Sequence, residues 1–156
     1  MTMDPVQTLL IKQDIHERLL AYWRNVDDDA GRQAGSFWTE DAVWEAPART
    51  FNGREEIQGF FDWRLTRGDR LALHTVANFV AEVQDERSAT STWYLLLYAA
   101  DGTPPKPSEP PVQVAAISDT WVHDGDGPWL CSHRTFKVLF EGGGALSGPA
   151  AGGERK

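Results

Sequence analysis

Hydrophobic residues near the start of the chain recur with the period of an α-helix. Five of them lie at spacings of three and four residues, as on one helix face: Ile15, Leu19, Tyr22, Trp23 and Val26. Asp4 and Pro5 precede this stripe and supply a capping carboxylate and a first-turn proline. The pattern predicts a long helix that begins after Asp4 and ends near Asp27.

Two more helices are predicted before position 70. The acidic residues 27–29 suit a helix N-terminus, so we expect a second, short helix that runs toward Trp38. A turn at 39–41 and a brief strand at 42–45 follow it. The turn signal at residues 52–53 precedes a third helix, whose buried face is expected to contain Ile57, Phe60, Phe61 and Leu65.

From position 71 onward the pattern changes to that of β-strands. Residues with β-branched and aromatic side chains form runs separated by turn residues, which predicts four strands, at 71–84, 88–100, 112–123 and 128–140. Together they predict an antiparallel meander. The segment 101–111 contains five prolines and is expected to project as an extended loop.

Helices followed by strands indicate an α+β domain, with three N-terminal helices on one face of a curved antiparallel sheet that encloses a pocket. We assign residues 1–141 to this single domain. The remaining segment, 142–156, has eleven Gly, Ala, Ser or Pro residues in fifteen and is expected to be a flexible tail.

The amino-acid composition excludes several classes of function and partner. The 156 residues fit one domain, and the 11% aromatic content can fill a sizeable apolar interior. A net charge of −8 disfavours nucleic acid and anionic membranes as partners. The longest apolar run, 93–100, is too short to span a bilayer, which needs about 20 residues. Cys131 is the only cysteine, so an internal disulfide is excluded and a reducing, cytoplasmic location is expected.

The first long strand contains two polar residues that are candidates for a functional site. His74 and Asn78 share one strand face with Val76 and Val80. That face either lines a pocket or is solvated, and an isolated strand histidine is commonly structural. Asp27 also has two interpretations. It belongs to a solvated acidic cluster, or, if the first helix ends at the mouth of the sheet, its carboxylate holds His74 in one tautomer.

Several short motifs follow one another in an informative order. They are Leu19-Leu20-Ala21-Tyr22, Val26-Asp27, Phe37-Trp38-Thr39-Glu40-Asp41-Ala42-Val43-Trp44, Asn52-Gly53-Arg54-Glu55-Glu56-Ile57, Phe60-Phe61, the run from His74 to Asn78, Asp119-Thr120-Trp121, Trp129 and His133-Arg134. Over roughly residues 9–140 this order resembles the SnoaL-like branch of the NTF2-like superfamily. That group includes polyketide cyclases, scytalone dehydratase, a hexachlorocyclohexane dehydrochlorinase and ketosteroid-isomerase-like proteins.

The resemblance implies an NTF2-like (cystatin-like) cone, a homodimer formed through the sheet, and chemistry without metal or organic cofactor. In the dehydratase and dehydrochlorinase relatives, an aspartate after the first helix pairs with a strand histidine that abstracts a proton from carbon. Asp27 and His74 match these positions. Val26 stands where dehydratases often have a tyrosine, so a dehydratase acid is in doubt. His133 supplies a second imidazole or lies on the outer face.

Other residues are candidates for binding the substrate. Asn78, Tyr94, Tyr98 and Arg134 could donate hydrogen bonds to developing negative charge. The tyrosines share one strand face, and the sequence leaves open whether that face lines the pocket or packs with its hydroxyls in water. Arg134 binds an anionic group or pairs with acids at the surface. Trp44, like the other aromatic residues, suits a flat polycyclic substrate or fills the core.

The leading hypothesis is a cofactor-independent lyase or isomerase, of the dehydratase, cyclase or isomerase type. His74 would be the base, Asp27 would orient it, and the substrate would be a small hydrophobic molecule. The sequence contains no glycine-rich phosphate loop and no cluster of metal ligands. The alternative is a non-catalytic protein that binds a small ligand, or a small β-type subunit of a ring-hydroxylating oxygenase.

Overall fold

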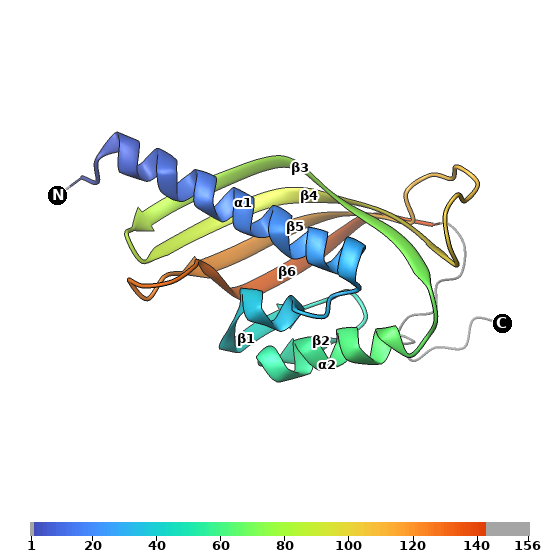
Figure 1. Ribbon diagram of the computed structural model, residues 1–156. Helices are drawn as coiled ribbons and strands as arrows, with labels where there is room; N and C mark the ends of the chain where they lie inside the picture. Colours follow the sequence, from blue (N-terminus) through green and yellow to red (C-terminus); the bar gives the residue numbers. More distant parts are fainter. Residues whose placement is uncertain (1, 143–156) are drawn as a thin grey trace.

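A six-stranded sheet forms the body of the protein in the computed structural model, which describes residues 2–142. The strands are β1 (Trp38–Glu45), β2 (Thr50–Asn52), β3 (Arg70–Asp85), β4 (Ser88–Asp101), β5 (Gln113–Val122) and β6 (Leu130–Glu141). They lie in the order β2-β1-β6-β5-β4-β3 (Figure 1). The predicted meander of β3 to β6 is confirmed, but the sheet is mixed, because β1 pairs with β6 in parallel.

Helix α1 (Pro5–Asp29) forms where the hydrophobic stripe predicts it. The Asp4 carboxylate accepts a hydrogen bond from the backbone N–H of Gln7 and caps the first turn. The helix continues to Asp29, where Ala30 adopts the left-handed conformation that ends many helices. Its buried face packs against β3 and the core and contains Ile11, Ile15, Leu19, Tyr22 and Trp23.

The prediction of three helices is wrong within the described residues, which contain two α-helices, α1 and α2 (Arg54–Leu65), and one four-residue 3-10 turn, η1 (Ala34–Phe37). The acidic residues 27–29 belong to the last turn of α1, not to a new helix. The turn expected at 39–41 lies inside β1, where the pairing with β6 is irregular between Trp38 and Val43. Residues 39–41 continue the strand between its two paired parts, Trp38, which pairs with β6, and residues 43–45, which pair with both β2 and β6.

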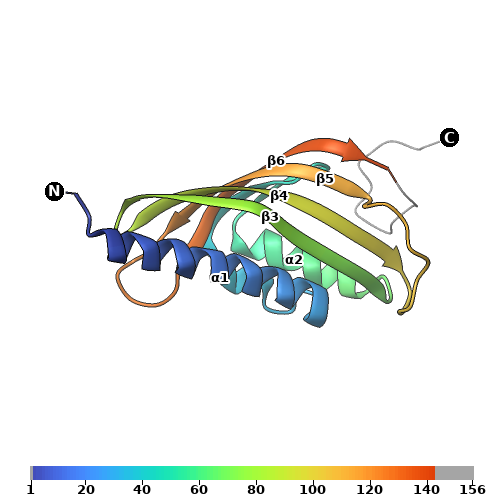
Figure 2. The same ribbon diagram turned by 90° about the horizontal axis from the view of Figure 1, so that it is seen from above.

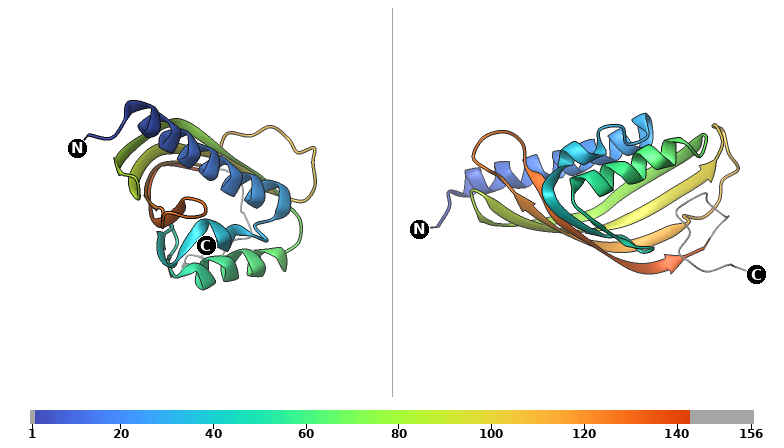
Figure 3. Two further views of the ribbon diagram at one scale, coloured as in Figure 1. Left: turned by 60° about the vertical axis from the view of Figure 1, so that its left-hand side comes forward. Right: turned by 90° about the horizontal axis from the view of Figure 1, so that it is seen from below.

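Both helices lie on the same side of the sheet, which curls around them (Figures 2 and 3). The inner face of β4 is the one that carries Trp93 and Leu95, and these side chains are buried against α1 and its neighbours. A bulge between Ala77 and Val80 interrupts the pairing of β3 with β4 and bends the long strand. The curvature leaves a hollow between the sheet, the end of α1, and α2.

The remaining predictions concern the loop, the tail and the membrane. The proline-rich segment between β4 and β5 projects from the end of the sheet, as expected (Figure 1). The expected flexible tail lies, apart from Gly142, outside the described residues. No helix within residues 2–142 combines the length and the hydropathy of a membrane-spanning segment.

Candidate active site

The hollow of the sheet is a cavity of about 1250 Å³. Aromatic side chains from β1, β2, α2 and β6 form one wall of it, and Trp44 stacks on Phe51 with ring centres 4.9 Å apart. The other aromatic residues of this wall are Phe60, Phe61 and Phe136. A cavity of this size with mostly apolar walls suits a small hydrophobic molecule.

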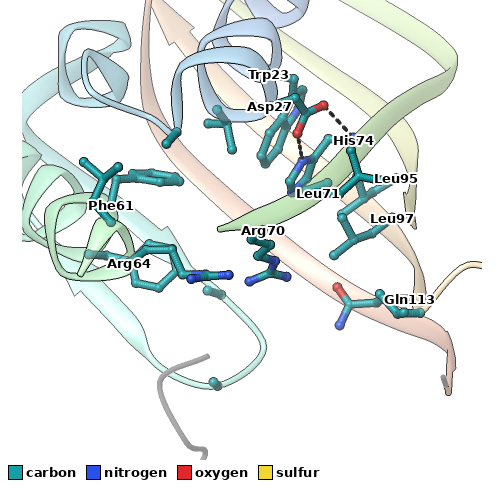
Figure 4. A pocket seen from close by; sticks show the side chains of 18 of the residues that line it. Trp23, Asp27, Phe61, Arg64, Arg70, Leu71, His74, Leu95, Leu97 and Gln113 are labelled. Atoms are coloured by element: carbon teal, nitrogen blue, oxygen red, sulfur yellow. Dashed lines mark hydrogen bonds and ion pairs between the residues drawn. The ribbon is translucent and has the colours of Figure 1, made fainter. Parts of the chain in front are cut away.

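A histidine–aspartate pair lies on the opposite wall (Figure 4). The Nδ1 atom of His74 is 2.6 Å from Oδ1 of Asp27. The backbone N–H of His74 donates a second hydrogen bond to Oδ2 of the same carboxylate, at 2.8 Å. Asp27 lies in the last turn of α1 and His74 in β3, so the carboxylate links helix and strand through both of its oxygens.

The surroundings of the pair fix the imidazole in one orientation. Trp23, one helical turn before Asp27, stacks on the ring of His74 with centres 4.1 Å apart and planes within 6°. The side chains of His74 and Asp27 are only 12% and 10% exposed. Because Nδ1 faces the carboxylate, the neutral ring carries its proton on Nδ1 and leaves Nε2 as the free base.

Burial and the carboxylate act on the histidine in opposite directions. Burial lowers the pKa of His74, the contact with Asp27 raises it, and the balance is a pKa below the ordinary value. Nearby Arg70 and Arg134 lower it further. At neutral pH the imidazole is therefore uncharged and able to accept a proton.

Arg134, a candidate for substrate binding, is placed elsewhere. It is 1% exposed, and its Nε donates to Oδ1 of Asp119 at 2.6 Å. The same carboxylate accepts a hydrogen bond from the indole N–H of Trp93 at 2.8 Å. The guanidinium lies within 5.5 Å of four aromatic ring centres, those of Tyr22, Trp23, Trp38 and Trp93. This arrangement is part of the core, and Arg134 is not among the residues that line the cavity.

The other predicted binding residues separate into two groups. Trp44 lines the cavity. Asn78, Tyr94 and Tyr98 are exposed on the sheet and do not line it, as far as residues 2–142 describe it. Asn78 lies at the bulge of β3 with a φ of 53°, so the simple alternation that puts it on the face of His74 fails there. His133 lies at the surface, paired with Glu45.

The sequence interpretation missed two arginines that line the cavity, Arg64 of α2 and Arg70 at the start of β3. Arg64 falls on the buried stripe of α2, three residues after Phe61, and Arg70 falls on the alternating face that contains His74. Both signals were present in the sequence. A charged residue on an expected buried face is the observation that could have revealed them.

No group of three or more His, Cys, Asp or Glu side chains in the described part of the chain is arranged to hold a metal ion. Four polar side chains lie around the inner part of the cavity in Figure 4: the imidazole of His74, the guanidinium groups of Arg64 and Arg70, and the amide of Gln113. Two further arginines of the lining, Arg32 and Arg49, are paired with Asp29 and Glu56. This arrangement combines one base with several hydrogen-bond donors in an apolar enclosure, which is what proton transfer from carbon requires.

Comparison with known proteins identifies the domain. The family model described as "SnoaL-like domain" matches residues 7–135. No curated protein sequence matches the chain.

Solved structures share the fold but little sequence. A candidate scytalone dehydratase from Novosphingobium aromaticivorans superposes with a TM-score of 0.73 at 17% identity, covering 97% of this chain and all of the other. A Nostoc punctiforme protein of unknown function with a cystatin-like fold gives 0.70 at 18% identity, covering 89% and 96%. ActVI-ORFA from Streptomyces coelicolor gives 0.68 at 16% identity, covering 82% and 96%. At these identities the similarity shows the fold alone, which is cystatin-like and NTF2-like.

Proposed function

The chain belongs to the SnoaL-like domain family, and we propose that it is a cofactor-independent lyase or isomerase that abstracts a proton from carbon. His74 is the base, Asp27 orients it, and the substrate is a small hydrophobic molecule held in the cavity. The observation that carries this proposal is the buried Asp27–His74 contact at the cavity wall. One of the structures that share this fold is that of a candidate scytalone dehydratase, and dehydration belongs to this reaction class.

The reaction begins when Nε2 of His74 takes a proton from a C–H group next to a carbonyl. The electron pair of that C–H bond moves into the carbonyl and forms an enolate. In an isomerase, the substrate carries a C=C bond next to the deprotonated carbon, so the enolate is a conjugated dienolate. The imidazolium then returns the proton to the far carbon of that double bond, and the double bond moves into conjugation with the carbonyl. In a lyase, the electron pair returns from the oxygen and expels a leaving group from the adjacent carbon, and the proton leaves with it or passes to water. Each route restores the neutral imidazole.

Asp27 is a positioning residue in this scheme. Its carboxylate accepts the Nδ1 proton throughout, so Nε2 is the atom that exchanges protons with the substrate. When the ring becomes positively charged, the carboxylate 2.6 Å away stabilises that charge at a position that is only about one-tenth exposed. Stacking on Trp23 keeps the imidazole from rotating out of line.

Exchange of carbon-bound hydrogen in heavy water tests the proposal without knowledge of the natural substrate. The protein is incubated in D₂O with a panel of enolisable cyclic ketones, such as 1-tetralone and 2-tetralone, and the loss of α-protons is followed by ¹H NMR. We expect the wild-type protein to accelerate exchange for members of the panel and the His74→Ala variant to lose this acceleration.

His133→Ala is the matched control, because it removes a histidine that also contacts a carboxylate but lies at the surface. It should exchange as fast as the wild type. Equal rates for wild-type and His74→Ala proteins on every ketone would contradict the assignment of His74 as the base. A thermal melt of each variant shows whether the fold is retained.

We also propose that the protein is a homodimer formed through the outer face of the sheet. That face exposes several large hydrophobic side chains, which include Leu73, Val80, Tyr94, Tyr98, Leu139 and Phe140. Light scattering after size-exclusion chromatography measures the mass directly. A monomer at micromolar concentration would contradict this proposal, and a monomer that copurifies with a larger iron enzyme would favour the oxygenase-subunit alternative.

A further inference from the structure

Two buried arginines in the cavity have no role in the proton transfer described above. Arg64 is 9% exposed and Arg70 is partly buried, and both line the cavity. Figure 4 shows their guanidinium groups pointing toward each other from α2 and from the start of β3, with the amide of Gln113 facing the same space. Two like charges in an apolar enclosure repel each other, so the arrangement calls for a negative charge between them.

The donors of these arginines are incompletely satisfied by the protein. Nε and Nη1 of Arg64 and Nε of Arg70 are buried without a hydrogen-bond partner among the described residues. Buried polar groups are normally paired, so three unpaired donors in one place need an explanation. The Nη2 atom of Arg64 lies 3.4 Å from Oδ1 of Asp101, whose side chain is about half exposed to water.

The acids near the cavity supply only part of the missing charge. Asp101 lies 3.4 Å from Arg64 and raises the pKa of both arginines, but its side chain is 47% exposed to water. Asp69 and Glu141, which also line the cavity, are exposed. Asp27 is committed to His74 through both of its oxygens. Asp28 and Asp29 pair with Arg24 and Arg32 at the surface. Burial lowers the pKa of both Arg64 and Arg70, and the charge of Arg64 lowers that of Arg70 further, while Asp101 acts in the opposite direction on both. Together with the unpaired donors, this balance means that a further negative charge between the two cations would be favourable.

We infer that the substrate is a hydrophobic carboxylic acid, bound as its carboxylate by Arg64 and Arg70 while its ring system lies against the aromatic wall. Two planar guanidinium groups match the two oxygens of a carboxylate. Beside these two arginines the cavity offers the amide of Gln113, whereas the other arginines of its lining, Arg32 and Arg49, are already paired with Asp29 and Glu56. The single charge of a carboxylate therefore fits this set of donors better than the greater charge of a phosphate monoester. This inference rests on the proposed function, because it names the class of molecule presented to His74.

The separation between the arginine pair and His74 limits the size of that molecule. Arg70 and His74 are four residues apart on β3, so their backbones are separated by roughly 13 Å. Part of that span is taken up by the arginine and histidine side chains. A bicyclic or tricyclic acid is long enough to place its carboxylate at the arginines and a C–H group at Nε2 of His74.

Binding of 2-naphthoate and of its neutral analogue 2-naphthamide tests the inference. Isothermal titration calorimetry with the full chain should give a dissociation constant at least tenfold lower for the carboxylate. Arg64→Gln and Arg70→Gln should each weaken naphthoate binding at least tenfold and change naphthamide binding less than twofold. Arg67→Gln is the matched control, since Arg67 is an exposed arginine of the same region that lies over Trp63.

Several results would overturn the inference. They are equal binding of naphthoate and naphthamide, no binding of naphthoate, unchanged naphthoate binding in both glutamine variants, or tighter binding of 2-naphthyl phosphate than of naphthoate. Arg64→Lys keeps the charge and guards against a folding defect, and it should retain part of the preference for naphthoate. His74→Ala should keep the full preference, so a failure of the proton-transfer proposal and a failure of the carboxylate inference are separable.

Discussion

Two histidine–carboxylate pairs in this protein have the same contact distance and different surroundings. Nδ1 of His74 and Nε2 of His133 each lie 2.6 Å from a carboxylate oxygen, of Asp27 and Glu45 respectively. The first pair is 12% and 10% exposed, whereas the second is 47% and 48% exposed. Only the first is held by a backbone N–H and a stacked indole, and only the first lines the cavity.

The comparison shows that contact distance alone does not identify a site. Water screens the charges of His133 and Glu45 and competes for hydrogen bonds with both. Their contact therefore contributes little to the stability of the fold, and the two side chains are free to rearrange. The pair of His74 and Asp27 is only about one-tenth exposed, so its charge and orientation are set mainly by the protein. Four expectations test how far this difference extends.

The largest difference should appear in proton exchange. Asp27→Asn removes the negative charge and replaces one of the two acceptor oxygens with an amide NH₂, which can donate to Nδ1 and favour the wrong tautomer of His74. It should slow ketone exchange by about 10²–10⁴-fold. Glu45→Gln makes the corresponding change at the surface pair and should leave the exchange rate within about twofold of wild type, because Glu45 takes no part in the proton transfer. The NMR assay in D₂O measures both. Similar losses in the two variants would contradict the distinction between the pairs.

The second difference should appear in stability. Asp27→Ala leaves the backbone N–H and the Nδ1–H of His74 buried without an acceptor, and should lower the free energy of unfolding by about 1–3 kcal/mol. Glu45→Ala should lower it by less than about 1 kcal/mol, because the surface pair is solvated. Urea denaturation at neutral pH gives both values. A loss for Glu45→Ala as large as that for Asp27→Ala would show that burial is not the deciding factor.

The third difference concerns pH. The pKa of His74 is lowered in the folded state, so the unfolded chain takes up this proton at a higher pH, near 6.5. The contribution of His74 to the free energy of unfolding is therefore fully present above pH 6.5. It is lost as the pH falls from 6.5 through the lower pKa of the folded state, and the free energy of unfolding then falls by at most about 1.4 kcal/mol per pH unit.

Urea denaturation between pH 7.5 and 5 should show this slope in the difference between wild-type and His74→Asn proteins. His133→Asn is the matched variant and keeps His74 in place. The exchange rate should likewise remain on its plateau below pH 6.5. A midpoint above pH 6.5 for exchange would mean that the carboxylate, rather than burial, dominates the pKa of His74.

The smallest effect is expected on the outer face of the sheet. Tyr94 and Tyr98 are exposed there, whereas Trp93 and Leu95 of the same strand are buried inside. Tyr94→Phe and Tyr98→Phe remove only hydroxyl groups that do not reach the cavity, so the exchange rate should stay within about twofold of wild type. A tenfold lower exchange rate in either variant would show that its hydroxyl group takes part in the reaction.

Sequence patterns located most of the elements because those patterns depend on short-range physics. The stripe from Ile15 to Trp23 predicts α1, since a helix buries positions three and four residues apart. The strand predictions fall within two residues of β3, β4, β5 and β6, since turn residues punctuate the chain at each end. The prediction of a second helix was wrong because the acidic residues 27–29 form the last turn of α1. Asp28 pairs with Arg24 one turn earlier, and Asp27 is held by His74 of β3, a contact that local pattern does not reveal.

The candidate site was only partly accessible to sequence reasoning. Pattern and resemblance together selected Asp27 and His74, and the structure places their side chains in contact. Arg134 was selected as a possible anion-binding residue but lies in the core with Asp119, whereas Arg64 and Arg70 line the cavity. Which of these arginines faces the cavity depends on the path of α2 and on the curvature of the sheet, and neither follows from local pattern.

The sequence by itself determined the α+β class, the order of the elements and the residue types available for chemistry, because periodicity and turn chemistry act between near neighbours. Tertiary structure alone decided which face of β4 is inside, which histidine is shielded from water, and which two arginines meet across the cavity. These outcomes depend on how far the sheet bends and where α1 and α2 settle on it, and therefore on the packing of residues that are distant along the chain.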